Sequence, residues 1–354
     1  MRIAVALSGG VDSAVAAYTL KQQGHDVVGL TMLLSLSSAG SDHLETTTAA
    51  ASRVAAVLDI EHTVLDATER FRELVIAPFL REYASGRTPN PCIVCNEAVK
   101  FGLLMDEADG LGAGLMATGH HARVVTGDDG ARLLRGRDGA KDQSYFLYRL
   151  SQKQLARSLM PIGEMTKDEV RAIATDLGVT AFSGRESADM CFAGAGLPAF
   201  IRSEAPELLR PGPIEDLDGR TLGEHDGVAL YTVGQRSGLG VAVGIPVYVI
   251  RIDVARRAVI VGDGSQLMSG ALEAHDLAWP SGGPPAHEFE AVARVRYAAR
   301  PARCRVTVEH HSARVRFTEE QRAIAPGQSV VFYDGDHVLG GGIIEHAAGM
   351  REER

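Results

Sequence analysis

The stretch that decides the fold reads Ile3-Ala4-Val5-Ala6-Leu7-Ser8-Gly9-Gly10-Val11-Asp12-Ser13. Its apolar run ends in a Ser-Gly-Gly turn, and a second apolar segment then reaches Leu20, with Gly24 as the expected helix stop. This pattern predicts a buried strand, a tight glycine turn and a helix. Glycines let the backbone approach a phosphate closely, and the first N–H groups of the helix are unpaired. The stretch therefore predicts an anion-binding cradle.

The loop differs from a Walker A loop because residues 8–13 contain no lysine. It resembles the PP-loop of ATP pyrophosphatases, and the resemblance implies that it grips the β- and γ-phosphates of ATP and exposes the α-phosphate. Ser8 and Ser13 add hydroxyl donors, and Asp12 is placed to hold Mg²⁺. An ordinary glycine-rich turn is the alternative interpretation.

The composition bounds the class of protein. The chain has 354 residues, 45% of them hydrophobic and 23% charged, which is typical of a globular protein with more than one domain. The net charge of −9 argues against a nucleic-acid partner unless basic residues gather on one face. Because we see no basic and apolar leader and no long apolar run, we expect a cytoplasmic protein without a membrane partner. We also expect a monomer.

Residues 1–200 alternate strand and helix signals, which predicts a doubly wound α/β domain around a parallel sheet. The expected elements are strands 26–32, 62–65 and 115–118 and helices 46–58, 71–83 and 96–111. Capping-box patterns at Ser151 and Thr166 open two further helices. Residues 123–135 are typical of a hairpin turned at Asp129-Gly130.

The rest of the chain changes to short alternating runs separated by Gly, Asp and Pro. Residues 201–272 predict a small β-rich domain that contacts tRNA, with hairpins at Asp218-Gly219 and at 247–261. Residues 273–354, with a Pro- and Gly-rich linker at 280–285, predict an antiparallel β-barrel. Five barrel strands are expected, at 291–297, 304–308, 313–317, 329–333 and 338–344.

Three of the four cysteines suggest chemistry. Cys92 and Cys95 form a C-x-x-C, and Cys95 is expected just before a helix that Asn96 caps, where the helix dipole favours the thiolate. Cys191 supplies a third thiol from a distant segment, and thiols from two loops suggest a sulfur relay. A structural zinc site completed by Cys191 and a histidine, or an inert C-x-x-C, are the alternatives. Cys304 is typical of a buried small hydrophobe.

Further segments combine with the phosphate loop and the cysteines. They are Thr88 to Asn96, Ala117 to Arg123, Lys141 to Tyr145, Glu186 with Cys191-Phe192, Thr232 to Gly240, Arg296-Tyr297, Pro326 to Gln328 and Val331 to Tyr333. In this order, and nearly end to end, they closely resemble the motifs of the tRNA-specific 2-thiouridylases. GMP, asparagine, argininosuccinate and NAD synthetases share the Ser-Gly-Gly loop, but they do not share the paired cysteines or the Gly-Gln-Arg-x-Gly-Leu-Gly segment.

The resemblance implies a tRNA-uridine 2-sulfurtransferase. In that reaction ATP adenylates O2 of the wobble uridine and releases pyrophosphate, and a cysteine persulfide then delivers sulfur to C2 with loss of AMP. The implied cofactors are ATP and Mg²⁺. The implied partners are tRNA and a protein that supplies persulfide sulfur, either a cysteine desulfurase or a sulfur-relay protein. The target base must leave its stack to reach the site.

The resemblance also implies roles residue by residue. Cys95 is the nucleophile and Cys191 carries the persulfide, and the two are implied to form a disulfide bond during the reaction. The residues implied to bind ATP are Ala6, Leu7, Ser8, Gly9, Gly10, Val11, Asp12, Ser13, Met32 and Gly119. Those implied to face the target base are Asn90, Pro91 and Cys92, and those implied to contact tRNA elsewhere are His120, Lys141, Asp142, Gln143, Arg296, Tyr297 and Gln328.

Two departures from the family pattern bear on the mechanism. Cys92 stands where many members have an aspartate, a candidate general acid or base. It adds a third thiol, so an iron–sulfur cluster held by the three thiols is the alternative to the persulfide route, which we favour. The second departure is Leu33-Leu34-Ser35, where the family often has an Asn-Trp pair. Rival functions are a ligase that amidates an adenylated small molecule and a non-catalytic nucleotide-binding module.

Arginines concentrate in the predicted barrel despite the acidic total. They are Arg294, Arg296, Arg300, Arg303 and Arg305. Arg294 and Arg296 are expected to share the face of one strand, and Arg303 and Arg305 that of another. This arrangement predicts a basic stripe that contacts RNA. A solvated charged face is the alternative.

Overall fold

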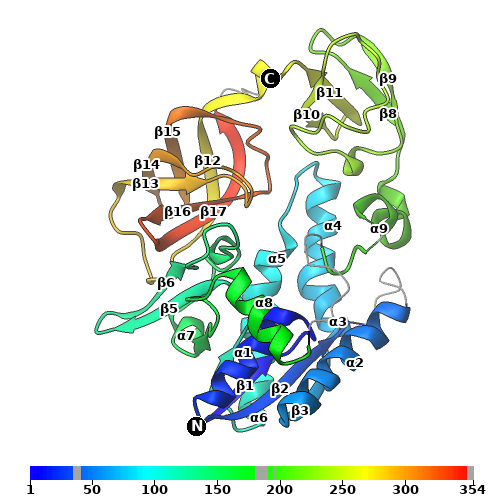
Figure 1. Cartoon of the computed structure of the whole chain (residues 1–354). Coiled ribbons are helices and arrows are strands. Elements are labelled where there is room, and N and C mark those ends of the chain that lie inside the picture. The colour runs from blue at the N-terminus through cyan, green and yellow to red at the C-terminus, as the bar shows by residue number, and fades with distance from the viewer. Residues whose placement is uncertain (35–40, 180–189, 195, 349–354) are drawn as a thin grey trace.

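The structure, a computed structural model of the chain, describes residues 1–34, 41–179, 190–194 and 196–348. An N-terminal α/β part, a small central β part and a C-terminal β-barrel follow one another along the chain (Figure 1). The fold class predicted from the sequence is therefore confirmed. Ser35 and residues 186–189 lie outside the described residues. Within the described ranges, no helix is long and apolar enough to cross a membrane.

A five-stranded parallel sheet with the order β3-β2-β1-β4-β7 forms the centre of the N-terminal part. Its strands are β1 (Arg2–Ala6), β2 (Asp26–Leu33), β3 (Glu61–Asp66), β4 (Leu115–Ala117) and β7 (Ser158–Leu159). The strand order reverses between β1 and β4, and open α/β sheets bind ligands at the carboxyl ends of the strands at such a point. The predicted phosphate loop follows β1 directly at this position.

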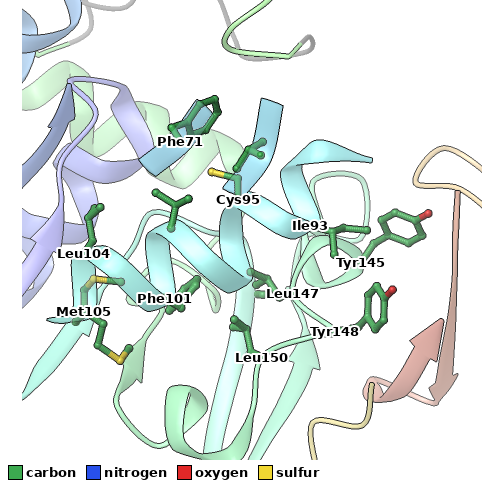
Figure 2. Close-up of a cluster of buried hydrophobic side chains, with 14 of the residues drawn as sticks. Phe71, Ile93, Cys95, Phe101, Leu104, Met105, Tyr145, Leu147, Tyr148 and Leu150 are labelled. Carbon is green, nitrogen blue, oxygen red and sulfur yellow. The ribbon is translucent and has the colours of Figure 1, made fainter. Parts of the chain in front are cut away.

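Helices cover both faces of this sheet, because successive residues of β1 point to opposite sides. Ile3 and Val5 pack against α1 (Val11–Gln22), α2 (Ser41–Leu58) and α8 (Lys167–Asp176). Ala4 faces the second layer, which holds α3 (Thr68–Phe71), α4 (Ala77–Ala84), α5 (Pro91–Val94) and α6 (Leu104–Gly110). Figure 2 shows the core of the second layer, in which Cys95 lies among Phe71, Ile93 and Leu104.

The helices of the second layer contain two π-helical segments. These are η2 (Arg72–Ile76), between α3 and α4, and η3 (Cys95–Leu103), between α5 and α6. Each predicted helix in this layer is therefore a run of α and π turns. The predicted helix 96–111 also begins earlier than expected, at Pro91.

The central part is a four-stranded sheet with the order β10-β11-β8-β9. Its strands are β8 (Gly212–Glu215), β9 (Thr221–His225), β10 (Tyr248–Asp253) and β11 (Ala258–Gly262). Both hairpins predicted here are present, β8 with β9 and β10 with β11. The short helix α9 (Leu197–Glu204) precedes this sheet.

The C-terminal part is a closed barrel of six antiparallel strands, one more than predicted. The strands are β12 (Met268–Ala278), β13 (Glu288–Arg294), β14 (Ala302–Glu309), β15 (Ser312–Arg322), β16 (Ser329–Asp334) and β17 (His337–Ala348). The missed strand is β12, whose Ala-Leu-Glu-Ala run at 271–274 favours a helix by local propensity. Pairing with both β15 and β17 overrides that propensity.

The predicted hairpin of β5 (Ala122–Gly127) and β6 (Gly130–Arg135) joins the barrel to the α/β part, because β6 pairs with β17. Its turn residues are Asp128 and Asp129, one position before the predicted turn. Ser151 caps α7 (Gln152–Leu155), and Thr166 caps α8, each in a complete capping box as predicted.

Candidate active site

The phosphate loop joins β1 to α1 in a tight turn. Gly9 has φ +75°, and a Cβ atom there would lie 2.6 Å from the Ala50 Cβ, so a larger residue does not fit. Ser13 Oγ accepts from the Ser8 N–H at 3.2 Å and donates to the Gly10 carbonyl at 3.0 Å. No side chain of the described residues caps the N-terminus of α1, so its first N–H groups point to a place where an anion can bind.

Asp12, in the first turn of α1, is held by two residues from distant segments. Lys167 Nζ lies 2.7 and 2.8 Å from its two carboxylate oxygens, and His121 Nε2 lies 3.4 Å from Oδ1. Burial alone would raise the pKa of Asp12, but the hydrogen bonds from His121 and Lys167 and the charge of Lys167 hold this pKa below its ordinary value. The carboxylate is therefore ionised and can serve as an oxygen ligand for Mg²⁺.

The loop after β4 packs directly on the phosphate loop. A Cβ atom at Gly119 would lie 2.6 Å from the Ser13 backbone nitrogen, so glycine is required for this approach. His120 is buried, and its Nδ1 lies 2.8 Å from Thr118 Oγ1. Burial, and then the charge of Lys100, lower the pKa of His120 well below its ordinary value, while Asp12 raises it. His120 is thus neutral and lies within electrostatic range of both Asp12 and Lys100.

The helix that carries two of the thiols differs from the prediction. Asn90, and not Asn96, is its N-cap: the Asn90 side chain accepts a hydrogen bond from the Cys92 N–H at 3.2 Å. Asn96 is buried in the helix and donates to the Phe146 carbonyl. Cys95 therefore lies in the second turn and not before the first, because Pro91 opens the helix four residues earlier.

This shift overturns the expected activation of Cys95. Burial raises the pKa of Cys95 to about 12, with the Cys191 and Cys92 thiols adding to the shift and Lys100 opposing it. Burial also raises the pKa values of Cys92 and Cys191, and Lys100 lowers both. The prediction of a thiolate favoured by the helix dipole was wrong for Cys95. The cation that acts on the thiols is Lys100.

The structure brings the three thiols together, as their mutual effects on pKa indicate. Cys95 is buried, whereas Cys92 and Cys191 keep part of their side chains open to solvent although protein atoms crowd both thiols, and none of the three forms a disulfide among the described residues. Among the described residues, no three His, Cys, Asp or Glu side chains are arranged to hold a metal ion. Cys304 faces the barrel core, as predicted.

The tRNA-contact candidates fall into two groups: those whose side chains are bonded to other parts of the protein, and those nearer the surface. Asp142 is fully buried: its carboxylate accepts from the Arg135 side chain and from the N–H groups of Gly136 and Ser144. Gln143 Oε1 accepts from the His121 N–H at 2.9 Å, which ties this loop to the phosphate site. Gln328 belongs to the same group, because its side chain donates to the Thr88 carbonyl at 2.8 Å.

Tyr297 is the exposed aromatic candidate, and its ring lies against that of Phe146, tilted by 36°, with centroids 4.5 Å apart. Arg296 donates to the carbonyls of Arg322 and Ala323 at 2.9 and 3.3 Å. Lys141 is half-buried, and Pro91, the first residue of the helix that carries Cys92 and Cys95 (the thiol helix), is buried. Met32 is half-buried near the carboxyl end of β2.

The predicted basic stripe is only partly present. Arg294 is buried and lies 3.7 Å from Asp142, and β13 ends there, so Arg294 and Arg296 do not share a strand face. Arg305 is paired with Glu288 and Glu290. Arg300 and Arg303 are exposed, and neither forms an ion pair within the part of the chain that the structure describes. The sequence interpretation missed the acidic residues of β13, Glu288 and Glu290, which face Arg305 on β14.

Three functional candidates were not singled out from the sequence: Lys100, His121 and Lys167. Lys167 was detectable in part, because the capping box at Thr166 places it in the first turn of α8. Only the tertiary structure shows that this turn faces Asp12. No sequence pattern assigned a role to Lys100 or to His121.

Three family models match the chain in succession. They are described as the tRNA methyl transferase HUP domain (residues 1–195), the tRNA methyl transferase PRC-barrel domain (199–263) and the Aminomethyltransferase beta-barrel domain (269–344). These ranges correspond to the α/β part, the central part and the barrel. The first model alone covers more than half of the chain.

Curated relatives match over nearly the full length. A protein of Geotalea uraniireducens named tRNA-specific 2-thiouridylase MnmA is 45% identical over 362 residues, 99% of this chain and 96% of that protein. A protein of Roseiflexus castenholzii with the same name is 47% identical over 368 residues, 97% of this chain and 99% of that protein. One from Clostridium perfringens, again with this name, is 42% identical over 352 residues, with 97% and 98% covered.

Proposed function

The chain belongs to the family of tRNA-specific 2-thiouridylases, and we propose that it adenylates the wobble uridine of tRNA and then transfers sulfur to C2. The observation that carries the proposal is the junction of two sites. The loop of Gly119 and His120 packs on the phosphate loop, where a Cβ atom at Gly119 would lie 2.6 Å from the Ser13 nitrogen, and the His120 ring lies 6.0 Å from the ring of Phe101, in the π-helical segment that begins at Cys95. One bound nucleotide can therefore be adenylated and thiolated without leaving the site.

In the first step, O2 of the uridine attacks the α-phosphorus of ATP and pyrophosphate leaves. The N–H groups at the start of α1 and the hydroxyls of Ser8 and Ser13 are suited to bind the departing phosphates. The Asp12 carboxylate fits a Mg²⁺ ion, which would neutralise phosphate charge when bound. Lys167, paired with Asp12, adds a second cation at the same point.

In the second step, a donor protein supplies a persulfide sulfur to Cys191, which is exposed. The terminal sulfur attacks C2, and the C2–O2 bond breaks with release of AMP. The Cys95 thiolate then attacks the Cys191 Sγ, which frees the sulfur on C2 and leaves a Cys95–Cys191 disulfide. An external dithiol reduces this disulfide by two electrons. Lys100 favours the thiolate of Cys95, whose burial opposes it.

We propose that RNA contacts come from the barrel and from residues 141–143 of the α/β part. Tyr297 offers an exposed ring for base stacking, and stacking on an aromatic ring is a common way to hold an unpaired base. Arg300 and Arg303 are exposed cations for phosphates. Asp142 acts from within, because it fixes the loop that presents Lys141 and Gln143.

The test uses purified protein, a tRNA transcript, ATP labelled in the α-phosphate and a persulfide donor. We expect AMP and pyrophosphate with 2-thiouridine, detected by mass spectrometry of nucleosides. Asp12→Asn should lower AMP formation by about a hundredfold, because it removes a metal ligand and little volume. ADP as the main product, or a methylated nucleoside that depends on S-adenosylmethionine, would contradict the proposal.

A further inference from the structure

Thr88 lies in the loop between α4 and α5, and each of its three polar groups is bonded to another part of the chain. Its N–H donates to the Pro326 carbonyl at 2.8 Å, and its own carbonyl accepts from Gln328 Nε2 at 2.8 Å. Its hydroxyl donates to Thr232 Oγ1 at 3.2 Å. Pro326 and Gln328 belong to the barrel, and Thr232 belongs to the central part. This one residue of the α/β part is thus held by both of the others.

The barrel turn fits closely around Thr88. Gly327 has φ +88°, and a Cβ atom there would lie 2.8 Å from the Thr88 backbone nitrogen. The preceding residue, Arg87, donates to the Ile344 carbonyl at 3.1 Å and pairs with Glu345 at 2.9 Å, both on β17. Two consecutive residues are therefore bound to the barrel, and Arg87 is largely buried. The loop at residues 87–88 is therefore joined to the barrel by defined hydrogen bonds and an ion pair.

A rigid spacer joins this anchor to the thiol helix. Only Pro89, Asn90 and Pro91 separate Thr88 from Cys92. Each proline fixes its own φ angle, and a residue before a proline is also restricted. Asn90, between the two prolines, caps the helix through the Cys92 N–H. Because the spacer has few conformations, the position of Thr88 sets the position of the first helical turn.

We propose that Thr88 is a positioning residue for sulfur transfer, through which the central part and the barrel set the position of Cys92 and Cys95. The reaction that it serves rests on the proposed function. The positioning itself is a property of the free protein and is testable without substrate. The proposal also gives Gln328 a role inside the protein: its amide holds the thiol loop, whether or not it also contacts tRNA.

The test compares substitutions that remove one bond each. Thr88→Val removes the hydroxyl and keeps the shape, Thr88→Ser keeps the hydroxyl, and Gln328→Met removes the amide donor. Matched controls are Thr126→Val, at an exposed position of β5, and Gln321→Met, whose side chain bonds only to nearby carbonyls. The first readout is hydrogen–deuterium exchange of the amides of residues 92–100 in the protein without RNA or ATP. The second is kcat and KM for tRNA.

We expect Thr88→Val and Gln328→Met to raise amide exchange in 92–100 about fivefold, the effect of losing one hydrogen bond. We expect kcat for thiolation to fall roughly tenfold with KM for tRNA unchanged, because misplaced thiols slow the chemistry and not binding. Thr88→Ser should retain both wild-type values, and the controls should not change either.

Unchanged exchange in Thr88→Val and Gln328→Met would overturn the proposal. So would a rise in KM for Gln328→Met without any change in exchange, because Gln328 would then act only on the RNA. Should the wild-type protein fail to thiolate tRNA, the proposed function would fail, while the exchange measurement would still decide the role of Thr88.

Discussion

Lys167 Nζ lies between the two carboxylate oxygens of Asp12, at 2.7 and 2.8 Å, although 155 positions separate the two residues. The pair joins the first turns of α1 and α8, so two helix N-termini meet at one carboxylate. A cation that binds Asp12 must share it with the lysine ammonium. The Asp12 carboxylate is therefore already paired with a cation before ATP and Mg²⁺ arrive.

Replacing Lys167 with methionine should make adenylation more sensitive to acid. The lysine charge and hydrogen bonds hold the pKa of Asp12 below its ordinary value, so removing them raises that pKa. Asp12 would then become protonated at a higher pH, and AMP formation would begin to fall at a higher pH than in the wild-type protein. The measurement is the rate of AMP formation as a function of pH. Lys153→Met, at an exposed position of α7, is the control, and an acidic limb that moves to lower pH would contradict the argument.

Replacing Lys100 with methionine should slow alkylation of the clustered thiols. The pKa values of Cys92, Cys95 and Cys191 are raised by burial, and Lys100 lowers all three. Only the thiolate reacts, so the rate should increase with pH, and loss of Lys100 should lower it at any given pH near neutrality. The experiment follows iodoacetamide labelling of each cysteine by peptide mass spectrometry. Labelling that is as fast in Lys100→Met as in Lys153→Met would show that Lys100 does not act on the thiols.

The sequence predicted most of the fold because its local signals agree with the tertiary structure. The glycine turn after β1, the capping boxes at Ser151 and Thr166 and the hairpin of β5 and β6 each depend on neighbouring residues. Strand β12 was missed because its propensity favours a helix, and only pairing with β15 and β17 makes it a strand. Local signals were thus sufficient where no long-range contact opposed them.

The site was predictable in its residue types but not in its electrostatics. A C-x-x-C before an apparent helix suggested an activated Cys95, yet the helix is capped by Asn90, six residues before the predicted cap Asn96, and Cys95 is buried. Asn90 and Asn96 are both acceptable N-caps by residue type. The choice between them depends on Pro91, which is favoured at the first helical position, and on the core that buries Cys95. Burial and the contact with Lys167 or Lys100 cannot be derived from spacing.

Replacing Arg296 with alanine should weaken tRNA binding and reduce its salt dependence. An arginine that neutralises one phosphate releases about one counterion, so the slope of log affinity against log salt should fall by about one. ATP binding should not change. Arg305→Ala is the matched comparison, since Arg305 is already paired with Glu288 and Glu290 and should leave the slope nearly unaltered. Equal slopes for the wild-type protein and Arg296→Ala would remove Arg296 from the RNA interface.

Serine substitutions should separate the roles of the three clustered thiols. Cys191→Ser should still adenylate the base but never thiolate it, because the persulfide has no carrier. Cys95→Ser should stop after at most one turnover, because no thiol remains to release the sulfur and form the disulfide with Cys191. Each variant is assayed for AMP release and for 2-thiouridine in a single-turnover experiment, so that the two steps are measured independently.

Cys92→Ser distinguishes the persulfide route from a cluster route. In the persulfide route Cys92 is a neighbour of the reacting sulfurs, and serine, similar in size and polarity, should preserve much of the activity. In a cluster route Cys92 would be a ligand, and its loss should abolish both thiolation and the visible absorbance of anaerobically prepared protein. We favour the persulfide route, so we expect a colourless wild-type protein and an active Cys92→Ser variant. A brown, iron-containing preparation whose activity disappears in Cys92→Ser would replace the persulfide route with the cluster route.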